Sequence, residues 1–105
     1  MAQNASDEKS IKDAGNRERR IREGELNDIR FLIANRQGRR FIWRFLAHCK
    51  LHGSVWEPSA RIHYNAGVQD VGHFLLAEVL EADPEAMLKM MQEAKDEKLK
   101  NGENL

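Results

Sequence analysis

The sequence is poor in the residues and runs that identify several large protein classes. It contains one cysteine, Cys49, which excludes an intramolecular disulfide framework and fits a reducing compartment. No run approaches the roughly 18 consecutive apolar residues of a transmembrane helix. The N-terminal segment carries no hydrophobic signal-peptide core. We therefore expect a soluble protein without a membrane span.

The chain also lacks the features of a nucleophilic active site. Threonine is absent, and the serines fall in predicted tail or loop segments, away from any base. No G-x-S-x-G, Walker A or dinucleotide-binding motif occurs. These absences predict a protein that is not an enzyme and that uses no cofactor.

The candidate metal ligands are three histidines and the single cysteine. His48 and His52 are four residues apart on one helical face, Cys49 is adjacent, and His63 follows in the next segment. Zinc needs about four ligands, and neighbouring residues on a helix point about 100° apart, so His48 and Cys49 are poorly placed to share an ion. We expect no metal site, with Cys49 as a small core residue and the histidines as polar groups near a helix end.

Charge is balanced overall but unevenly distributed along the 105 residues. Residues 1–50 hold 12 Lys and Arg against 7 Asp and Glu, whereas residues 51–105 hold 5 against 10. A chain of this length has room for one small domain. Its two halves can attract each other, stack on copies of the same chain, or offer the basic half to an anion.

Apolar spacing predicts an all-α protein, a small bundle of about four helices. Residues 1–24 are mostly charged and are expected to form a tail that is either disordered or a solvated helix. Residues 25–100 form the predicted helical domain, and 101–105 a disordered end. The expected helices, in chain order, are 25–34, 38–51, 65–81 and from 84 onward.

Several local signals support these bounds. Asn35 to Gly38 is expected to end the first helix as a turn, and 54–63 to form the long connection. Asp83 before Pro84 is a typical N-cap. Glycines early in the third helix indicate close approach of another backbone there; they are Gly67 and Gly72. The predicted apolar faces include Phe41, Ile42, Phe45, Leu46 and Cys49 in the second helix, and Val68, Val71, Phe74, Leu75, Val79 and Leu80 in the third.

The candidate functional residues lie in the stretch "NRQGRRFIWR". Arg36, Arg39 and Arg40 surround Gly38 at a predicted helix start, where backbone N–H groups and guanidinium groups together suit a phosphate or carboxylate. Alternatively, these arginines lie over the core and pair with acidic residues of the other half. The acids considered for that role are Glu78, Glu81 and Asp83.

Trp43 and Arg44 extend the cluster. Trp43 falls off the main apolar row, so it either packs against a neighbouring helix or lies in an exposed contact patch. Aromatic residues and arginine are enriched in interface cores. The sequence therefore predicts a partner-binding or anion-binding site formed by Arg36, Arg39, Arg40, Trp43 and Arg44.

Two segments carry a resemblance to a known family: "DIRFLIANRQGRRFIWRFLAHCKL" and "YNAGVQDVGHFLLAEVLEADPEAMLKMM". The shared features are Gly38-Arg39-Arg40, the pattern Asn65, Gly67, Val71, Gly72, and Ala82-Asp83-Pro84-Glu85. Over residues 26–92 the chain resembles a small, uncharacterised helical domain family of tailed bacteriophages, named after a Bordetella podophage virion-cluster protein.

The resemblance implies a non-enzymatic structural or interaction protein of a virion, associated with the portal region or with proteins ejected alongside DNA. Its expected partners are other virion proteins and further copies of itself, and its expected location is the virion and, before assembly, the cytoplasm of the infected host. Two alternatives stay open. One is a nucleic-acid-binding module that uses the arginine cluster, and the other is a phage inhibitor of a host protein.

Overall fold

Four α-helices account for most of the chain. The computed structural model describes residues 5–51, 53, 54, 56 and 58–102. The helices are α1 (Ala5–Leu32), α2 (Arg36–His48), α3 (Arg61–Ala82) and α4 (Ala86–Lys100). No strand occurs in the described ranges, which confirms the prediction of an all-α bundle of about four helices. None of the helices described is both long and apolar enough to cross a membrane.

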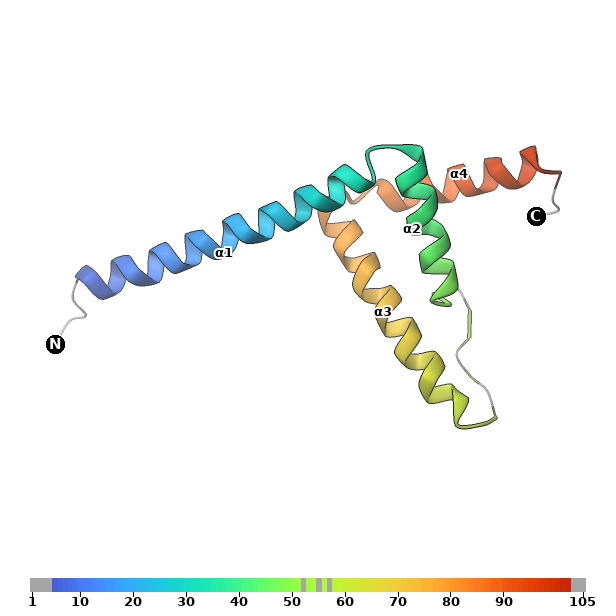
Figure 1. Ribbon diagram of the computed structural model, residues 1–105, viewed down its shortest axis with the longest axis horizontal. Helices are drawn as coiled ribbons and strands as arrows, with labels where there is room; N and C mark the ends of the chain where they lie inside the picture. Colours follow the sequence, from blue (N-terminus) through green and yellow to red (C-terminus); the bar gives the residue numbers. More distant parts are fainter. Residues whose placement is uncertain (1–4, 52, 55, 57, 103–105) are drawn as a thin grey trace.

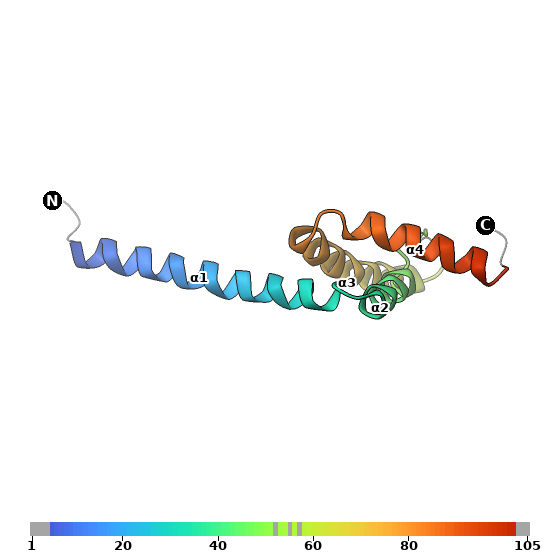
Figure 2. The ribbon, with the colours of Figure 1, turned by 90° about the horizontal axis from the view of Figure 1, so that it is seen from above.

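The molecule is long and thin. Figure 1 shows α2 and α3 running side by side, with α1 meeting the C-terminal end of α3 and projecting far beyond it. Seen from above, α4 lies across one face of the α2–α3 pair (Figure 2). The extents are 70 × 38 × 15 Å and the radius of gyration is 19.9 Å, whereas a compact chain of this length has about 13 Å. Each helix therefore exposes a large part of its surface.

The N-terminal charged segment is helical over residues 5–24, which is one of the two alternatives left open by the sequence. It continues without a break into the predicted helix at 25–34, so that α1 is 28 residues long. None of residues 5–25 is buried, and Leu26 is the first that is. At the other end, Asn101 and Gly102 form the turn that closes α4. Residues 1–4 and 103–105 lie outside the described part of the chain.

The junction between α1 and α2 corrects one prediction. Asn35 does not belong to a long turn; it is the N-cap of α2, and its side-chain oxygen accepts a hydrogen bond of 2.8 Å from the Gly38 N–H. The helix consequently starts at Arg36 rather than at Gly38. A Cβ on Gly38 would lie 1.7 Å from the Leu32 carbonyl oxygen, so the last turn of α1 requires glycine at this position.

The starts of the other two helices differ from prediction by a few residues. α3 begins at Arg61, four residues earlier than expected. α4 begins at Ala86, and its cap residue is Glu85 rather than Asp83. Asp83 still organises the turn, because its carboxylate accepts a 3.0 Å hydrogen bond from the Glu85 N–H.

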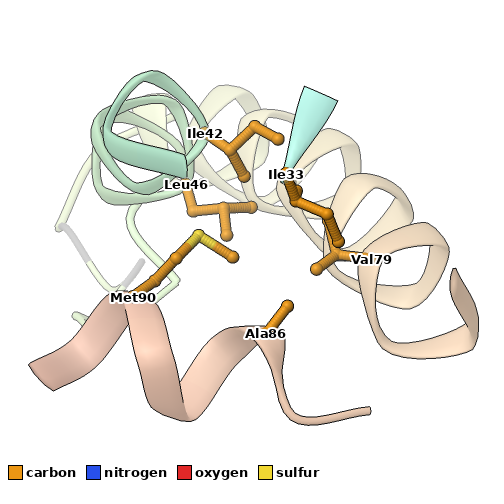
Figure 3. Close-up of a cluster of buried hydrophobic side chains, with 6 residues drawn as sticks. All are labelled: Ile33, Ile42, Leu46, Val79, Ala86 and Met90. Carbon is orange, nitrogen blue, oxygen red and sulfur yellow. The ribbon is translucent and has the colours of Figure 1, made fainter. Parts of the chain in front are cut away.

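The core is small and draws on α2, α3, α4 and the turn that follows α1. Figure 3 shows its six buried side chains converging where the segments meet: Ile33, Ile42, Leu46, Val79, Ala86 and Met90. Leu46 and Val79 have no exposed surface. Burial of such a side chain contributes about 1.5–3 kcal/mol to folding, so these few residues hold the helices together.

Cys49 and Gly72 show how closely α2 and α3 approach. Cys49 is buried, as predicted. A Cβ on Gly72 would lie 2.5 Å from the Cys49 Cβ, which confirms the expected close approach at that glycine. The same expectation is wrong for Gly67 within this chain, because nothing lies within 4 Å of a Cβ built there.

Several residues assigned to the apolar faces are outside the core. The exposed fraction is 58% for Phe41, 55% for Val71 and 68% for Phe74, and Phe45 and Leu80 are also exposed. The prediction that these side chains pack inside the bundle is wrong. The physical reason is the thinness of the molecule, since a layer 15 Å thick covers only one face of each helix.

Candidate functional site: a groove between α2 and α4

The predicted arginine cluster lies on α2, facing a helix that carries carboxylates. α2 contains Arg36, Arg39, Arg40 and Arg44 and has no acidic residue. α2 packs against α4, which supplies Glu93 and Glu97. The basic half and the acidic half of the chain thus attract each other in part. This is one of the three possibilities that the charge distribution left open.

Arg39 is a structural residue. It is 7% exposed, and its Nε and Nη2 donate hydrogen bonds of 2.8 and 2.9 Å to the two carboxylate oxygens of Glu93. Its Nη1 donates to the Ile33 carbonyl oxygen at 2.9 Å. These bonds from Arg39 lower the pKa of Glu93 against the opposing effect of burial. Arg39 therefore fastens α2 to α4 and to the end of α1, and little of its surface is left for a partner.

Arg36 and Arg40 are half-exposed and lie beside the same carboxylates. Arg36 Nη2 is 3.1 Å from Glu97 Oε2, and Arg40 Nη1 is 3.5 Å from Glu97 Oε1. Arg36 also lies 3.9 Å from Glu93. Exposed pairs of this kind contribute about 0–1 kcal/mol and break readily. Both arginines lie beside carboxylates of α4, and their exposed parts remain available to another carboxylate.

Arg44 differs from the other three. Its guanidinium lies 5.8 Å from the centre of the Phe41 ring, a cation–π geometry. Phe41 in turn contacts Phe45, with ring centres 6.3 Å apart. Within the part of the chain that the structure describes, no carboxylate pairs with Arg44.

The acids expected to neutralise this cluster have other partners. Arg22 of α1 bonds to Glu78 and Glu81 of α3, with one of its nitrogens 3.1 Å from Glu78 Oε1. These bonds raise the pKa of Arg22 and lower that of Glu78. Arg30 Nε donates to the Ala82 carbonyl oxygen at 2.9 Å. Sequence reasoning missed Arg22, because only the tertiary crossing of α1 over α3 brings it to these acids.

Trp43 both packs against a neighbouring helix and contributes to a contact surface, the two alternatives that the sequence left open. It is half-buried and packs against the core, and it also lines a hollow of about 230 Å³ between α2 and α4. Met90 and Ala94 of α4 complete the apolar floor. A second hollow of about 310 Å³ adjoins the first through Trp43, Ala94 and Lys98, and adds Met91 and Lys95. We call the two together the Trp43 groove.

The rim of the Trp43 groove is cationic. The first hollow is lined by five basic side chains and two carboxylates: Arg36, Arg39, Arg40, Arg44 and Lys98 against Glu93 and Glu97. Lys95 adds a further positive charge at the second. The groove therefore combines an apolar floor with a net positive edge, which suits a segment with an apolar anchor and acidic flanks.

The remaining candidates from the sequence are the possible metal ligands His48, Cys49, His52 and His63. His48 and His63 are exposed, and His52 lies outside the described residues. Among the described residues no three His, Cys, Asp or Glu side chains come together at metal-binding distance. No family model, curated protein or solved structure matches this chain.

Proposed function

We propose that this chain is a non-enzymatic structural and interaction protein of a tailed-phage virion, which binds a neighbouring virion protein through the Trp43 groove. The observation that supports this is the apolar floor at Trp43 inside a cationic rim. The partner segment is an amphipathic helix or strand with an apolar anchor for the floor and Asp or Glu for the rim. The virion context, at the portal region or among ejected proteins, comes from the family resemblance.

A protein segment fits the groove better than a nucleic acid does. Glu93 and Glu97 lie among the arginines, so a phosphate entering there would meet two carboxylates. Arg39 already uses its three donor nitrogens on Glu93 and Ile33. Nucleic-acid binding depends on several phosphate contacts and weakens steeply with salt. Binding of a nucleic-acid oligomer with that salt dependence would favour the alternative.

Particles assembled with variant proteins test the proposal. Arg44→Glu with Lys98→Glu removes the net positive charge of the rim without touching an ion pair of the described residues. A change at Arg39 would instead leave Glu93 without its main partner. Lys9→Glu with Lys12→Glu on α1 is the matched control, because it makes the same charge change far from the groove. Mass spectrometry of purified particles should find a fixed copy number for wild type and control, and at least a tenfold loss for the rim variant.

Two outcomes would overturn the proposal. Absence of the wild-type protein from purified particles would remove the virion role. A normal copy number for the rim variant would remove the groove from that role. Circular dichroism of each variant confirms that the helices are intact.

A further inference from the structure

One apolar row on α3 has no function in the fold described above. Tyr64, Gly67, Val71 and Phe74 are spaced i, i+3, i+7 and i+10, which places them in one row along the helix. The exposed fractions of Tyr64, Val71 and Phe74 are 66%, 55% and 68%, and the space beside Gly67 is open. We call these four residues the α3 seam.

The position of the α3 seam follows from the residues that continue it. Glu78 is seven residues after Val71 and Glu81 seven after Phe74, so both lie on the same row. Both bond to Arg22 of α1. The α3 seam therefore faces the side on which α1 crosses α3, and Arg22 of α1 contacts this row beyond the seam, at Glu78 and Glu81. In Figure 1 the rest of α3 on that side faces the open angle between the two helices.

We propose that the α3 seam binds the same seam of a second copy of this chain, with the two α3 helices antiparallel and related by a two-fold axis near Gln69. This arrangement places Tyr64 of each copy opposite Phe74 of the other, and Gly67 opposite Val71. The aromatic side chains then pair at both ends, and each Val71 enters the space that Gly67 leaves open.

Charge selects this arrangement over a parallel one. In the antiparallel pair the acidic end of each seam stays beside Arg22 of its own chain, so no unpaired carboxylate becomes buried. A parallel pair would bring Glu78 and Glu81 against their own copies and Gly67 against Gly67, which adds repulsion and leaves a gap. Asp70 flanks the seam near the two-fold axis and faces its own copy, which weakens the antiparallel dimer without preventing it.

The seam alone makes a small interface. Its three exposed side chains offer roughly 300–400 Å² per copy, against about 800 Å² in a standard interface. The dimer is therefore weak and reversible in dilute solution and is favoured where copies are held together. This inference does not depend on the virion role, although repeated contacts between copies would suit a particle.

Analytical ultracentrifugation of the full chain tests the dimer. Wild type should show a monomer–dimer equilibrium between roughly micromolar and millimolar concentration. Val71→Asp should abolish it, whereas Leu88→Asp, at another exposed apolar position on α4, should leave it unchanged. Asp70→Asn should tighten it severalfold, because it removes the like-charge contact at the axis. Wild type that stays monomeric throughout, or a dimer unaffected by Val71→Asp, would overturn the inference.

Cysteine cross-linking tests the antiparallel register. In a Cys49→Ala background, a mixture of the single variants Gly67→Cys and Val71→Cys should form a disulfide-linked dimer within minutes of mild oxidation. Each variant alone should form far less. Efficient cross-linking of each variant alone would indicate a parallel pair and refute the proposed register.

The two proposals fail in different ways. A chain that dimerises through the seam but is absent from particles would refute the virion role and leave the dimer intact. A chain found in particles but monomeric in solution at all concentrations would refute the dimer and leave the virion role intact.

Discussion

The inner α2–α4 contact and the outer side of α3 differ in how their side chains are covered. At the inner contact, Arg39 and Glu93 lie together over the buried core and satisfy each other within one chain. On the outer side, Tyr64 and Phe74 are about two-thirds exposed among the described residues. The comparison teaches that a core and a buried ion pair close the inner side within one chain, whereas apolar surface on the outer side remains available for contacts beyond it.

The largest expected loss of stability comes from a substitution at the junction of α1 and α2. Gly38→Ala should destabilise the fold by about 3 kcal/mol or more, since its Cβ would overlap the Leu32 carbonyl oxygen and displace α1 from α2. Urea unfolding followed by circular dichroism measures the change. Gly67→Ala is the matched control at an open position, and it should stabilise the chain by about 0.5–1 kcal/mol through helix propensity.

A smaller loss of stability is expected when the buried ion pair of Arg39 and Glu93 is broken, and a still smaller one for the exposed pairs of Glu97. Glu93→Ala should cost about 2–3 kcal/mol, because it leaves the Arg39 guanidinium buried without its carboxylate. Glu97→Ala removes partners of Arg36 and Arg40 that are half in solvent, and should cost less than about 1 kcal/mol. Equal costs in urea unfolding would show that burial does not distinguish the two pairs.

Acid should weaken two helix contacts gradually, the α2–α4 contact at Glu93 and the α1–α3 contact at Glu78. The pKa values of Glu93 and Glu78 are lowered in the folded chain from the ordinary value of 4.5. Their ionised forms therefore contribute stability above about pH 4.5, and this contribution is lost as the pH falls below that value and passes through the folded pKa values. Unfolding free energies between pH 7 and pH 3 should decline for wild type. The decline should be shallower for Glu93→Gln, which has no carboxylate to protonate at that position.

The smallest effect concerns the outer side. Phe74→Ser should change the unfolding free energy of the monomer by less than about 0.5 kcal/mol, because the ring contributes little to the core. The measurement is made at low protein concentration, where self-association does not contribute. A cost comparable to that of a buried phenylalanine, about 3–5 kcal/mol, would show that Phe74 is covered within the chain.

Helical periodicity was sufficient to predict four helices, with their bounds within about four residues except at the start of α1. It misjudged Asn35, because an Asn followed three residues later by Gly is compatible both with a turn and with an N-cap. Only the hydrogen bond from the Gly38 N–H decides between them. It also placed Phe41 and Phe74 in the core. Periodicity identifies an apolar face but carries no information about what covers that face.

The candidate site was predicted in part. Trp43, Arg40 and Arg44 lie on the groove, as a cluster on one turn of α2 should. Arg39 was assigned to the same surface, yet its side chain turns inward to Glu93. The α4 half of the groove was not anticipated, because Met90 and Ala94 are distant in sequence and reach Trp43 only through the packing of α4 on α2.

The sequence by itself determined the helical class, the turn chemistry at Asp83 and the excess of arginine on one helix, because these depend on residues close together in the chain. Only the tertiary structure decided which arginine is buried and which apolar rows remain outside. Those outcomes depend on how four short helices share one small core, and that core covers one face of each helix and leaves the other to solvent.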